Sequence, residues 1–250
     1  MESLTEEVKL YLDELVRRLV HLLETQLVGV YLFGSASNNA FEPGSSDLDV
    51  QAVVKNNLPT AAKQEIVSAI NQASLPCPAT KLEFVVYSQK AVNPASRHPR
   101  FELNLNTGPG RSDHVGLDPG NESSHWFLLD IAMGRELGRC LHGLPTAEAF
   151  AEIPRQWILE AISDSLKWHQ ANEISSANSV LNACRSLQYI ACGKWSSKME
   201  GAKWMMQQSD CPAVVEKAIV ARRTGQELPT AQVKELYDIA MVASDESLGR

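Results

Sequence analysis

The sequence predicts an α+β protein in which a small mixed sheet with helices is followed by an all-helical region. Short apolar runs bounded by turn residues, as is typical of buried strands, occur in the first half of the chain. After residue 124 the spacing of apolar residues is almost entirely that of helices. Gly143-Leu-Pro145 and Pro154 interrupt this pattern, so we expect one domain over residues 1–150 and a helical domain over residues 151–250.

Length and composition are those of an ordinary globular protein. The chain has 250 residues, of which 44% are hydrophobic and 21% are charged. No apolar run approaches the ~20 residues of a membrane span, and the acidic N-terminus does not resemble a signal peptide. The five cysteines lack a C-x-x-C pair, which favours buried thiols in a cytoplasmic protein. The net charge of -7 argues against a nucleic-acid partner, which usually needs a basic patch.

The first predicted element is a helix over residues 4–27. Apolar residues recur at i, i+3 and i+4 from Leu4 to Leu23, as on the buried face of an amphipathic helix. Ser3 and Glu6 have the spacing of a capping box, which predicts that the helix begins there. We expect this helix to pack on the sheet.

The next stretch contains the densest set of residues with chemical potential. Residues 28–33 are predicted to form a buried strand that ends at Gly34-Ser35, a turn whose backbone N–H groups can approach phosphate. A second strand is predicted to begin at Asp47 after a turn-rich loop. Because side chains alternate along a strand, Asp47 and Asp49 would share one face.

Two neighbouring carboxylates repel each other unless a cation lies between them, and hard oxygen ligands suit Mg²⁺. The pair therefore indicates a magnesium site. A solvated strand face that carries alternating acids is the alternative interpretation of Asp47 and Asp49 alone.

Further strands and a helix are predicted up to residue 106. Residues 60–73 form the expected helix, and Glu83 begins the apolar part of a strand over residues 80–87. We expect the helices to lie on one face of the sheet. In the alternating run from Phe101 to Asn106, Glu102, Asn104 and Asn106 would share a face that is either solvated or lines a substrate cleft.

The second half is predicted to be helical throughout. One apolar stripe runs from Trp126 to Leu141, and the next helix is marked by apolar residues from Ile158 to Leu166. Later helices are expected at residues 178–192, with Gly193 as the C-cap, and at 197–208, 212–223 and 230–244.

One helical face in this half carries hydrogen-bonding side chains. Asn178, Asn182, Arg185 and Tyr189 recur at i, i+4, i+7 and i+11, which indicates either a site-lining face or a solvated one. Ser197 and Glu200 fit a capping box, so the adjacent Lys198 would stand in the first turn of a helix. An anion such as a triphosphate would offset that positive charge, although a solvated lysine has the same sequence.

These motifs resemble a known family. A strand, Gly34-Ser35, about ten residues and then Asp47-Leu-Asp49 resembles the DNA polymerase β-type nucleotidyltransferase superfamily. Together with Leu82-Glu83, His125-Trp-Phe-Leu-Leu-Asp130, Leu181-Asn-Ala-Cys-Arg185 and Trp195-Ser-Ser-Lys198, the set resembles the streptomycin/spectinomycin adenylyltransferases over about residues 25–225. The N-terminal part is accordingly expected to be a nucleotidyltransferase domain.

The resemblance implies Mg-dependent transfer of AMP from ATP to a hydroxyl of a small cationic acceptor, such as spectinomycin or streptomycin. Asp47 and Asp49 would hold two Mg²⁺ ions, and Glu83 would be the general base. The triphosphate would be bound by residues of both domains: Gly34, Ser35, Ser46, Arg185 and Lys198. The acceptor would meet Glu83, Asn104, Asn178 and Asn182. A cytoplasmic monomer with no nucleic-acid or membrane partner is expected.

Two departures bear on the acceptor. The streptomycin-binding members carry a Trp after the glutamate strand, whereas Asn104-Leu-Asn-Thr-Gly108 has none. They also carry acids before the Asn-Arg helix, where residues 170–176 offer only Glu173. These differences favour the smaller spectinomycin. The alternatives are transfer to another small-molecule or protein hydroxyl, and a nucleotide-binding module without catalysis.

Overall fold

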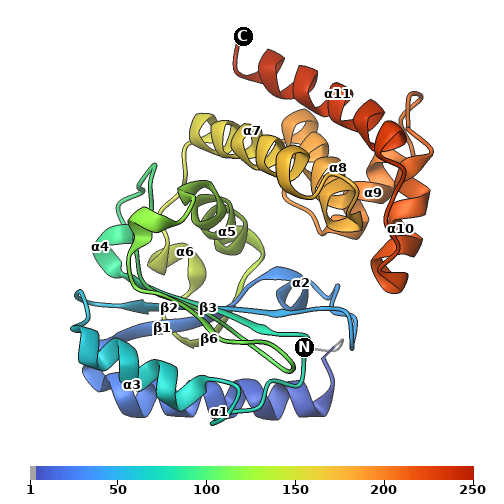
Figure 1. Cartoon of the computed structure of the whole chain (residues 1–250). Coiled ribbons are helices and arrows are strands. Elements are labelled where there is room, and N and C mark those ends of the chain that lie inside the picture. Colours follow the sequence, from blue (N-terminus) through green and yellow to red (C-terminus); the bar gives the residue numbers. More distant parts are fainter. Residues whose placement is uncertain (1–3) are drawn as a thin grey trace. The chain divides into compact units, whose positions relative to one another are not determined.

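The structure, a computed structural model, describes residues 4–250 and confirms the α+β prediction. The chain divides into two compact units, one ending at Ile153 and the other beginning at Pro154 (Figure 1). The first unit contains the sheet and the second is helical.

The first unit is built on one mixed sheet with the strand order β5-β4-β3-β2-β1-β6. Its strands are β1 (Leu27–Leu32), β2 (Leu48–Val54), β3 (Leu82–Ser88), β4 (Phe101–Thr107), β5 (His114–Gly116) and β6 (Arg139–Gly143). Strands β2 and β3 run parallel, whereas the other neighbouring strands are antiparallel. A parallel pair needs a crossover connection, and helix α3 (Thr60–Ile70) provides it.

Helices cover both faces of this sheet, so the expectation of helices on one face was wrong. Helix α1 (Glu6–Leu23) lies beside α3 on one face, and α5 (Ser124–Leu137) lies on the other (Figure 1). Shorter helical segments connect these elements: η1 (Glu24–Gln26), α2 (Gly34–Ser37), α4 (Gln89–Val92), η2 (Pro119–Asn121) and α6 (Thr146–Ala149).

The main hydrophobic core lies between the sheet and the α1–α3 layer. Alternate residues of β2, Leu48, Val50 and Ala52, are fully buried in it together with apolar residues of α1. The strand period of two therefore directs Asp49 and Gln51 to the opposite face. The core fixes which side of the sheet presents the acids.

Helix α1 begins at a different cap from the one expected. The side chain of Thr5 accepts a hydrogen bond from the backbone N–H of Val8, which satisfies one free donor of the first turn. The predicted cap Ser3 lies outside the described residues.

The predicted helix over Trp126–Leu141 is too long. Helix α5 ends at Leu137, and Gly138 donates its backbone N–H to the carbonyl of Gly134. The next five residues form β6, which pairs with β1 at the edge of the sheet. The helical spacing of Leu137 and Leu141 continues by coincidence into an extended segment, which is why the strand was missed.

The second unit contains five helices within the described residues. They are α7 (Arg155–Asn172), α8 (Ala177–Cys192), α9 (Lys198–Met205), α10 (Val214–Thr224) and α11 (Thr230–Ser247). Gly193 ends α8 in the left-handed conformation with φ 67°, and the Ser197–Glu200 capping box begins α9. Both predictions are confirmed. None of the helices described in the chain is long and apolar enough to cross a membrane.

Candidate active site

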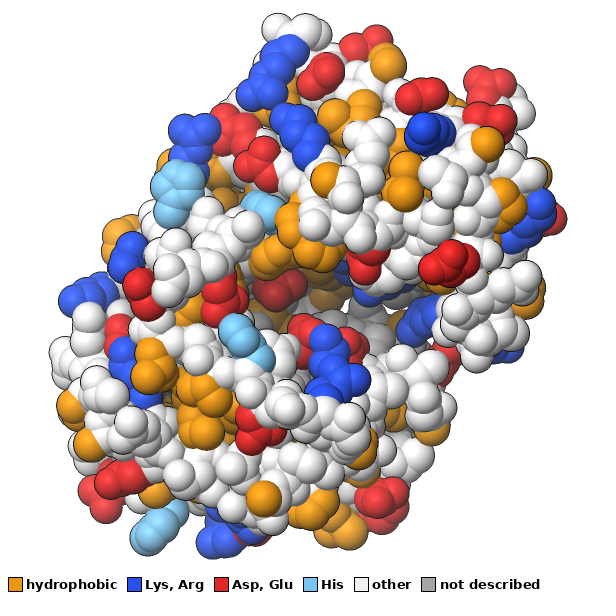
Figure 2. Space-filling view, viewed as in Figure 1, with side chains coloured by type: hydrophobic (Ala, Val, Ile, Leu, Met, Phe, Trp, Pro, Cys, Tyr) orange, Lys and Arg blue, Asp and Glu red, His pale blue; other side chains and the backbone are white. Residues whose placement is uncertain are grey.

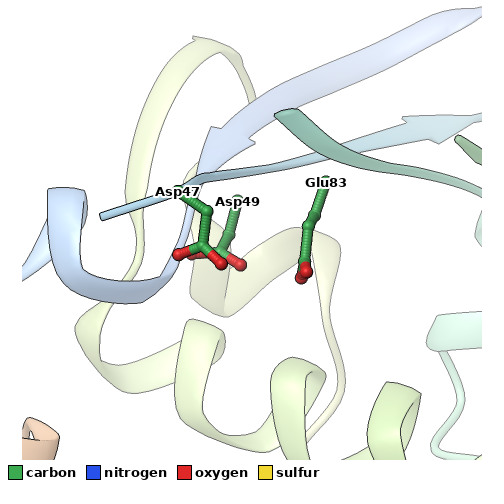
Figure 3. A group of neighbouring side chains, drawn as sticks. All are labelled: Asp47, Asp49 and Glu83. Carbon is green, nitrogen blue, oxygen red and sulfur yellow. The ribbon is translucent and has the colours of Figure 1, made fainter. Parts of the chain in front are cut away.

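Three carboxylates gather on the side of the sheet opposite the main core. Asp49 of β2 stands beside Glu83 of β3 in the parallel register, and Asp47 precedes β2 by one residue. One carboxylate oxygen of each residue lies within 4.8 Å of the others. Figure 3 shows the three side chains extending to the same side of the strands. The sequence reasoning thus predicted a group that the fold brings together.

Gly34 brings the turn after β1 into contact with this group. Its φ is +61°, and a Cβ atom at this position would lie 1.8 Å from Oδ2 of Asp49. The backbone N–H of Phe33 also donates to the carbonyl of Asp49 at 2.8 Å. A residue with a side chain would both strain the backbone and displace the carboxylate, so this position requires glycine.

The two predicted serines lie in different environments. The Oγ of Ser35 is buried and has no hydrogen-bond partner within residues 4–250. The Oγ of Ser46 accepts a hydrogen bond from the backbone N–H of Glu42 at 3.0 Å. Ser46 therefore holds the turn before Asp47, whereas the phosphate-binding role of Ser35 stays a prediction.

Arg139 supports the Gly-Ser turn from β6. Its Nε donates to the carbonyl of Ser37 at 2.5 Å, and its Nη2 donates to Oδ1 of Asn39 at 2.6 Å. Sequence reasoning missed this contact because it depends on the pairing of β6 with β1, which was not predicted.

Lys81 was also missed, although it stands two residues before Glu83. Its Nζ forms an ion pair with Oε1 of Glu83 and lies 3.8 Å from Oδ2 of Asp47. Burial disfavours the charged ammonium, but Glu83, Asp47 and Asp49 outweigh this effect and raise the pKa of Lys81 above its usual value. The spacing to Glu83 was the available signal, because residues two apart share a strand face.

The donor set fits a divalent metal ion. Carboxylate oxygens are the hard ligands that Mg²⁺ prefers, and here three acids offer one oxygen each within a single cluster. The ammonium of Lys81 among these acids shows that the cluster attracts positive charge. Asp47, Asp49 and Glu83 could therefore hold a metal ion.

Strand β4 extends the polar surface beyond Glu83, but only in part as predicted. Asn106 stands opposite Glu83 in the register, and Asn104 lies further along on the same face. Nδ2 of Asn104 donates to Oε2 of Glu122 at 2.6 Å, and Nδ2 of Asn106 lies 3.5 Å from Oδ1 of Asn104. Asn104 is thus held in place by a neighbouring acid.

Glu102 does not share this face, which corrects the prediction. The register between β3 and β4 shifts between Val86 and Tyr87, and the irregularity turns Glu102 toward α3. There it pairs with Lys63 at 2.9 Å and accepts a hydrogen bond from the backbone N–H of Leu58 at 3.2 Å.

In the second unit, the predicted polar residues of α8 form one hydrogen-bonded network with Lys198. Oδ1 of Asn178 accepts from Nζ of Lys198 at 2.6 Å and from Nδ2 of Asn182 at 3.2 Å. Oδ1 of Asn182 accepts from Nη2 of Arg185 at 2.7 Å. Two amide side chains thereby hold two cations in place. Tyr189, also predicted on this face, stacks on Trp195 with ring centroids 4.1 Å apart.

His169 and Glu173 complete this network and were not predicted as parts of it. Nδ1 of His169 lies 2.6 Å from Oε1 of Glu173, and Nε2 lies 3.2 Å from Nδ2 of Asn182. Burial lowers the pKa of His169, an effect that Glu173 opposes and that Lys198 and Arg185 reinforce. The contacts suit a neutral ring with its proton on Nδ1, because Nε2 then accepts from Asn182.

The sites divide between the units as follows. Asp47, Asp49, Glu83 and Gly34 meet in the first unit, and Asn178, Asn182, Arg185 and Lys198 meet in the second. That the two groups bind one nucleotide stays a prediction.

Comparison with known proteins supports the resemblance stated from the motifs. The family described as aminoglycoside adenylyltransferase, C-terminal domain, matches residues 148–243. Spectinomycin 9-adenylyltransferase of Staphylococcus aureus is 27% identical over 194 residues, covering 73% of this chain and 72% of that protein. Aminoglycoside (3'') (9) adenylyltransferase of Escherichia coli is 24% identical over 230 residues, covering 89% and 86%.

A solved structure shares the fold. The crystal structure of a spectinomycin adenyltransferase from Enterococcus faecalis, with ATP and spectinomycin, matches with a TM-score of 0.67 at 19% identity. The match covers 97% of this chain and 100% of that one. The predicted fold class and the predicted resemblance to this family are both confirmed.

Proposed function

We propose that this homologue of the aminoglycoside adenylyltransferases transfers AMP from ATP to a hydroxyl group of an aminoglycoside-type antibiotic, spectinomycin or streptomycin, and releases pyrophosphate. The observation that carries the proposal is the cluster of Asp47, Asp49 and Glu83 against the Gly34 turn. The spectinomycin and aminoglycoside adenylyltransferases that are similar to this chain support an antibiotic as the acceptor.

Glu83 is the proposed general base. Its carboxylate takes the proton from the acceptor hydroxyl as the oxygen forms a bond to the α-phosphorus, and the bond to the departing pyrophosphate breaks. A positioned carboxylate base contributes about 10²–10⁴ in rate. Asn106, which stands opposite Glu83 in the register, would help to orient the hydroxyl.

Asp47 and Asp49, with Glu83 beside them, would hold Mg²⁺. When bound, Mg²⁺ supplies positive charge that stabilises the oxygens of the transferring phosphate. Two ions, as the resemblance implies, are part of the proposal.

Each unit carries groups that suit the triphosphate of ATP. The backbone N–H groups of the Gly34 turn and the buried Oγ of Ser35 suit phosphate oxygens. Arg185 and Lys198, held by the amides of α8, would meet the charge that develops on pyrophosphate. Ser46 would act by holding the turn before Asp47. Because the proposed reaction consumes ATP, we expect it to take place in the cytoplasm.

The acceptor would be small and cationic. Acids lie along the proposed acceptor surface, with Glu122 bound to Asn104 beyond Glu83. On the face that Figure 2 shows, Lys and Arg side chains are interspersed with Asp and Glu rather than gathered into one basic field. Asn178 and Asn182 would contribute from the second unit, where Glu173 is already engaged by His169 and Asn178. Because Glu173 is engaged in this way and no other acid precedes α8 in residues 170–176, we favour the smaller spectinomycin over streptomycin as the acceptor.

The test is pyrophosphate release from Mg-ATP with spectinomycin, streptomycin and other aminoglycosides. Glu83→Gln is expected to lower the rate by about 10²–10⁴ without weakening ATP binding measured by calorimetry. The matched control is Glu65→Gln, the same chemical change at an exposed residue of α3 on the other face of the sheet. It should leave the rate unchanged.

Other outcomes would assign a different role. Release with a non-antibiotic alcohol or a protein acceptor would keep adenylyl transfer and replace the acceptor. ATP binding without release for any acceptor would contradict the enzyme proposal and favour a nucleotide-binding module.

A further inference from the structure

The cation that lies in the carboxylate cluster belongs to the chain itself. The ammonium of Lys81 forms an ion pair with Glu83 and lies 3.8 Å from Oδ2 of Asp47. It therefore contacts two of the three acids that fit a divalent ion. One positive charge so placed offsets part of the repulsion among three negative ones.

The backbone of Lys81 is fixed in this position. Its carbonyl accepts a hydrogen bond from the backbone N–H of Leu48 at 2.9 Å, which ties it to the start of β2. On the other side Gly108 packs so closely that a Cβ there would lie 2.8 Å from the Cα of Lys81. The backbone of Lys81 is therefore held from both sides, and its side chain is only 26% exposed.

A second lysine of the first unit, Lys63 of helix α3, pairs with an acid in a different way. Lys63 pairs with Glu102 at 2.9 Å on the opposite face, and among the described residues this pair belongs to no metal-binding group of acids. Lys63 forms its ion pair with one carboxylate, that of Glu102. Lys81 instead occupies a place between ligands that a metal ion would require.

We propose that Lys81 is an internal counter-ion of the carboxylate cluster, which stabilises the metal-free protein and weakens divalent-metal binding by competing for Asp47 and Glu83. The proposal rests on the proposed function for the metal-binding role of the cluster. It makes Lys81 a positioning residue that sets metal affinity. Metal binding then requires the ammonium to move away from Glu83.

The test is titration of the purified protein with Mn²⁺ alone, followed by electron paramagnetic resonance, without nucleotide or acceptor. Lys81→Met keeps the length of the side chain and removes its charge. We expect Mn²⁺ to bind Lys81→Met at least about tenfold more tightly than it binds the wild type. The reason is that a unit positive charge in contact with two ligands strongly opposes a divalent cation in a partly buried site. Lys81→Arg, which retains the charge, should bind Mn²⁺ as weakly as the wild type.

Thermal unfolding gives an independent readout. Without metal, Lys81→Met should melt below the wild type, and Mg²⁺ should raise its melting temperature by more than it raises that of the wild type. The matched control is Lys63→Met, which also breaks a lysine–glutamate pair of this unit. It should lower stability without changing Mn²⁺ affinity.

The proposal is overturned if Mn²⁺ affinity in Lys81→Met is unchanged or weaker than in the wild type. An unchanged Mn²⁺ affinity with weaker ATP binding would assign Lys81 to the nucleotide instead and would also overturn it. Loss of Mn²⁺ binding in Asp49→Asn shows that the cluster is the site being titrated. Since no acceptor is present, failure of antibiotic turnover leaves this result unaffected.

Discussion

Gly34 meets two requirements of the candidate site, one of the backbone turn and one of the neighbouring Asp49 carboxylate. Its positive φ and the missing Cβ serve different purposes, because the first forms the turn and the second makes room for Asp49. Gly110 meets only the first requirement. It has φ +70°, but a Cβ added there would have no described atom of a non-neighbouring residue within 4 Å.

Gly34→Ala is expected to lower the free energy of unfolding by about 1–3 kcal/mol and to abolish Mg-dependent pyrophosphate release, because the methyl group would displace the Asp49 carboxylate. Urea unfolding and the release assay measure the two effects. Gly110→Ala carries the backbone strain without the collision, so it should cost stability and preserve turnover. Equal turnover in the two variants would contradict the role assigned to Gly34.

At this scale the sequence predicted the acids, whereas their partners were missed. Asp47, Asp49 and Glu83 follow from strand alternation and from the motif, both of which are properties of sequence order. Lys81 and His169 contact the sites through side-chain directions that depend on neighbouring strands and helices. Glu102 was placed on the wrong face because an irregularity in the β3–β4 pairing has no signature in the alternating pattern.

Two elements of the second unit, α7 and α8, are joined through a buried histidine. His169 of α7 contacts Asn182 of α8, which in turn holds Arg185. Protonation of Nε2 would place a second N–H against the amide of Asn182 and add positive charge near Lys198 and Arg185. The joint between these helices therefore depends on a neutral ring.

This dependence predicts a pH effect on stability. The pKa of His169 in the folded protein is lowered, chiefly by burial, whereas that of an unfolded chain is about 6.5. Between the two values the unfolded chain binds more protons, so stability is complete above about pH 6.5 and is lost as the pH falls through the folded pKa. His169→Gln should flatten this decline.

Urea unfolding of the wild type and of His169→Gln between pH 5 and 8 would measure the difference. His142→Gln, at an exposed histidine of β6, is the control and should follow the wild-type profile. Parallel profiles for all three proteins would show that His169 is not the titrating group.

Among the elements, the long amphipathic helices were the most predictable. The spacing of apolar residues placed α3, α8 and α11 close to their observed bounds, whereas the helix predicted over residues 4–27 ran past the end of α1 at Leu23 into the start of β1. Strand β6 escaped detection because its leucine continues the helical spacing of α5, and only pairing with β1 decides in favour of a strand. The short β5, at the other edge, depends likewise on its partner β4.

For the whole molecule, the proposed function predicts that its ligands stabilise the fold. Mg-ATP at 100 times its Kd should raise the free energy of unfolding by about 2.7 kcal/mol, because it binds only the folded chain. Thermal unfolding with and without Mg-ATP measures this, and chelation of Mg²⁺ should reverse most of the shift.

Asp49→Asn is the matching variant for this measurement. Its melting temperature should respond little to Mg-ATP, since an amide is a poorer ligand for Mg²⁺ than a carboxylate. A full response in this variant would show that the nucleotide is bound without the cluster.

The division into a sheet-containing part and a helical part could be predicted from periodicity alone, since the two periods differ along the chain. The order of elements along the chain does not reveal that helices cover both faces of the sheet. The apolar stripe of α5 indicates that the helix packs on the sheet, but it does not indicate on which face. That choice is made by contacts such as Phe101 on Phe127, with ring centroids 4.9 Å apart.

The parallel pairing of β2 with β3 has a consequence for misfolding. A slip of β2 by one residue would exchange Asp49 and Gln51 with Leu48 and Val50, and would drive a carboxylate into the core beneath the sheet. The wrong register is thus disfavoured by the same acid that the proposed reaction needs. Variants that neutralise Asp49 should therefore lose a barrier to misalignment of β2 together with a candidate metal ligand.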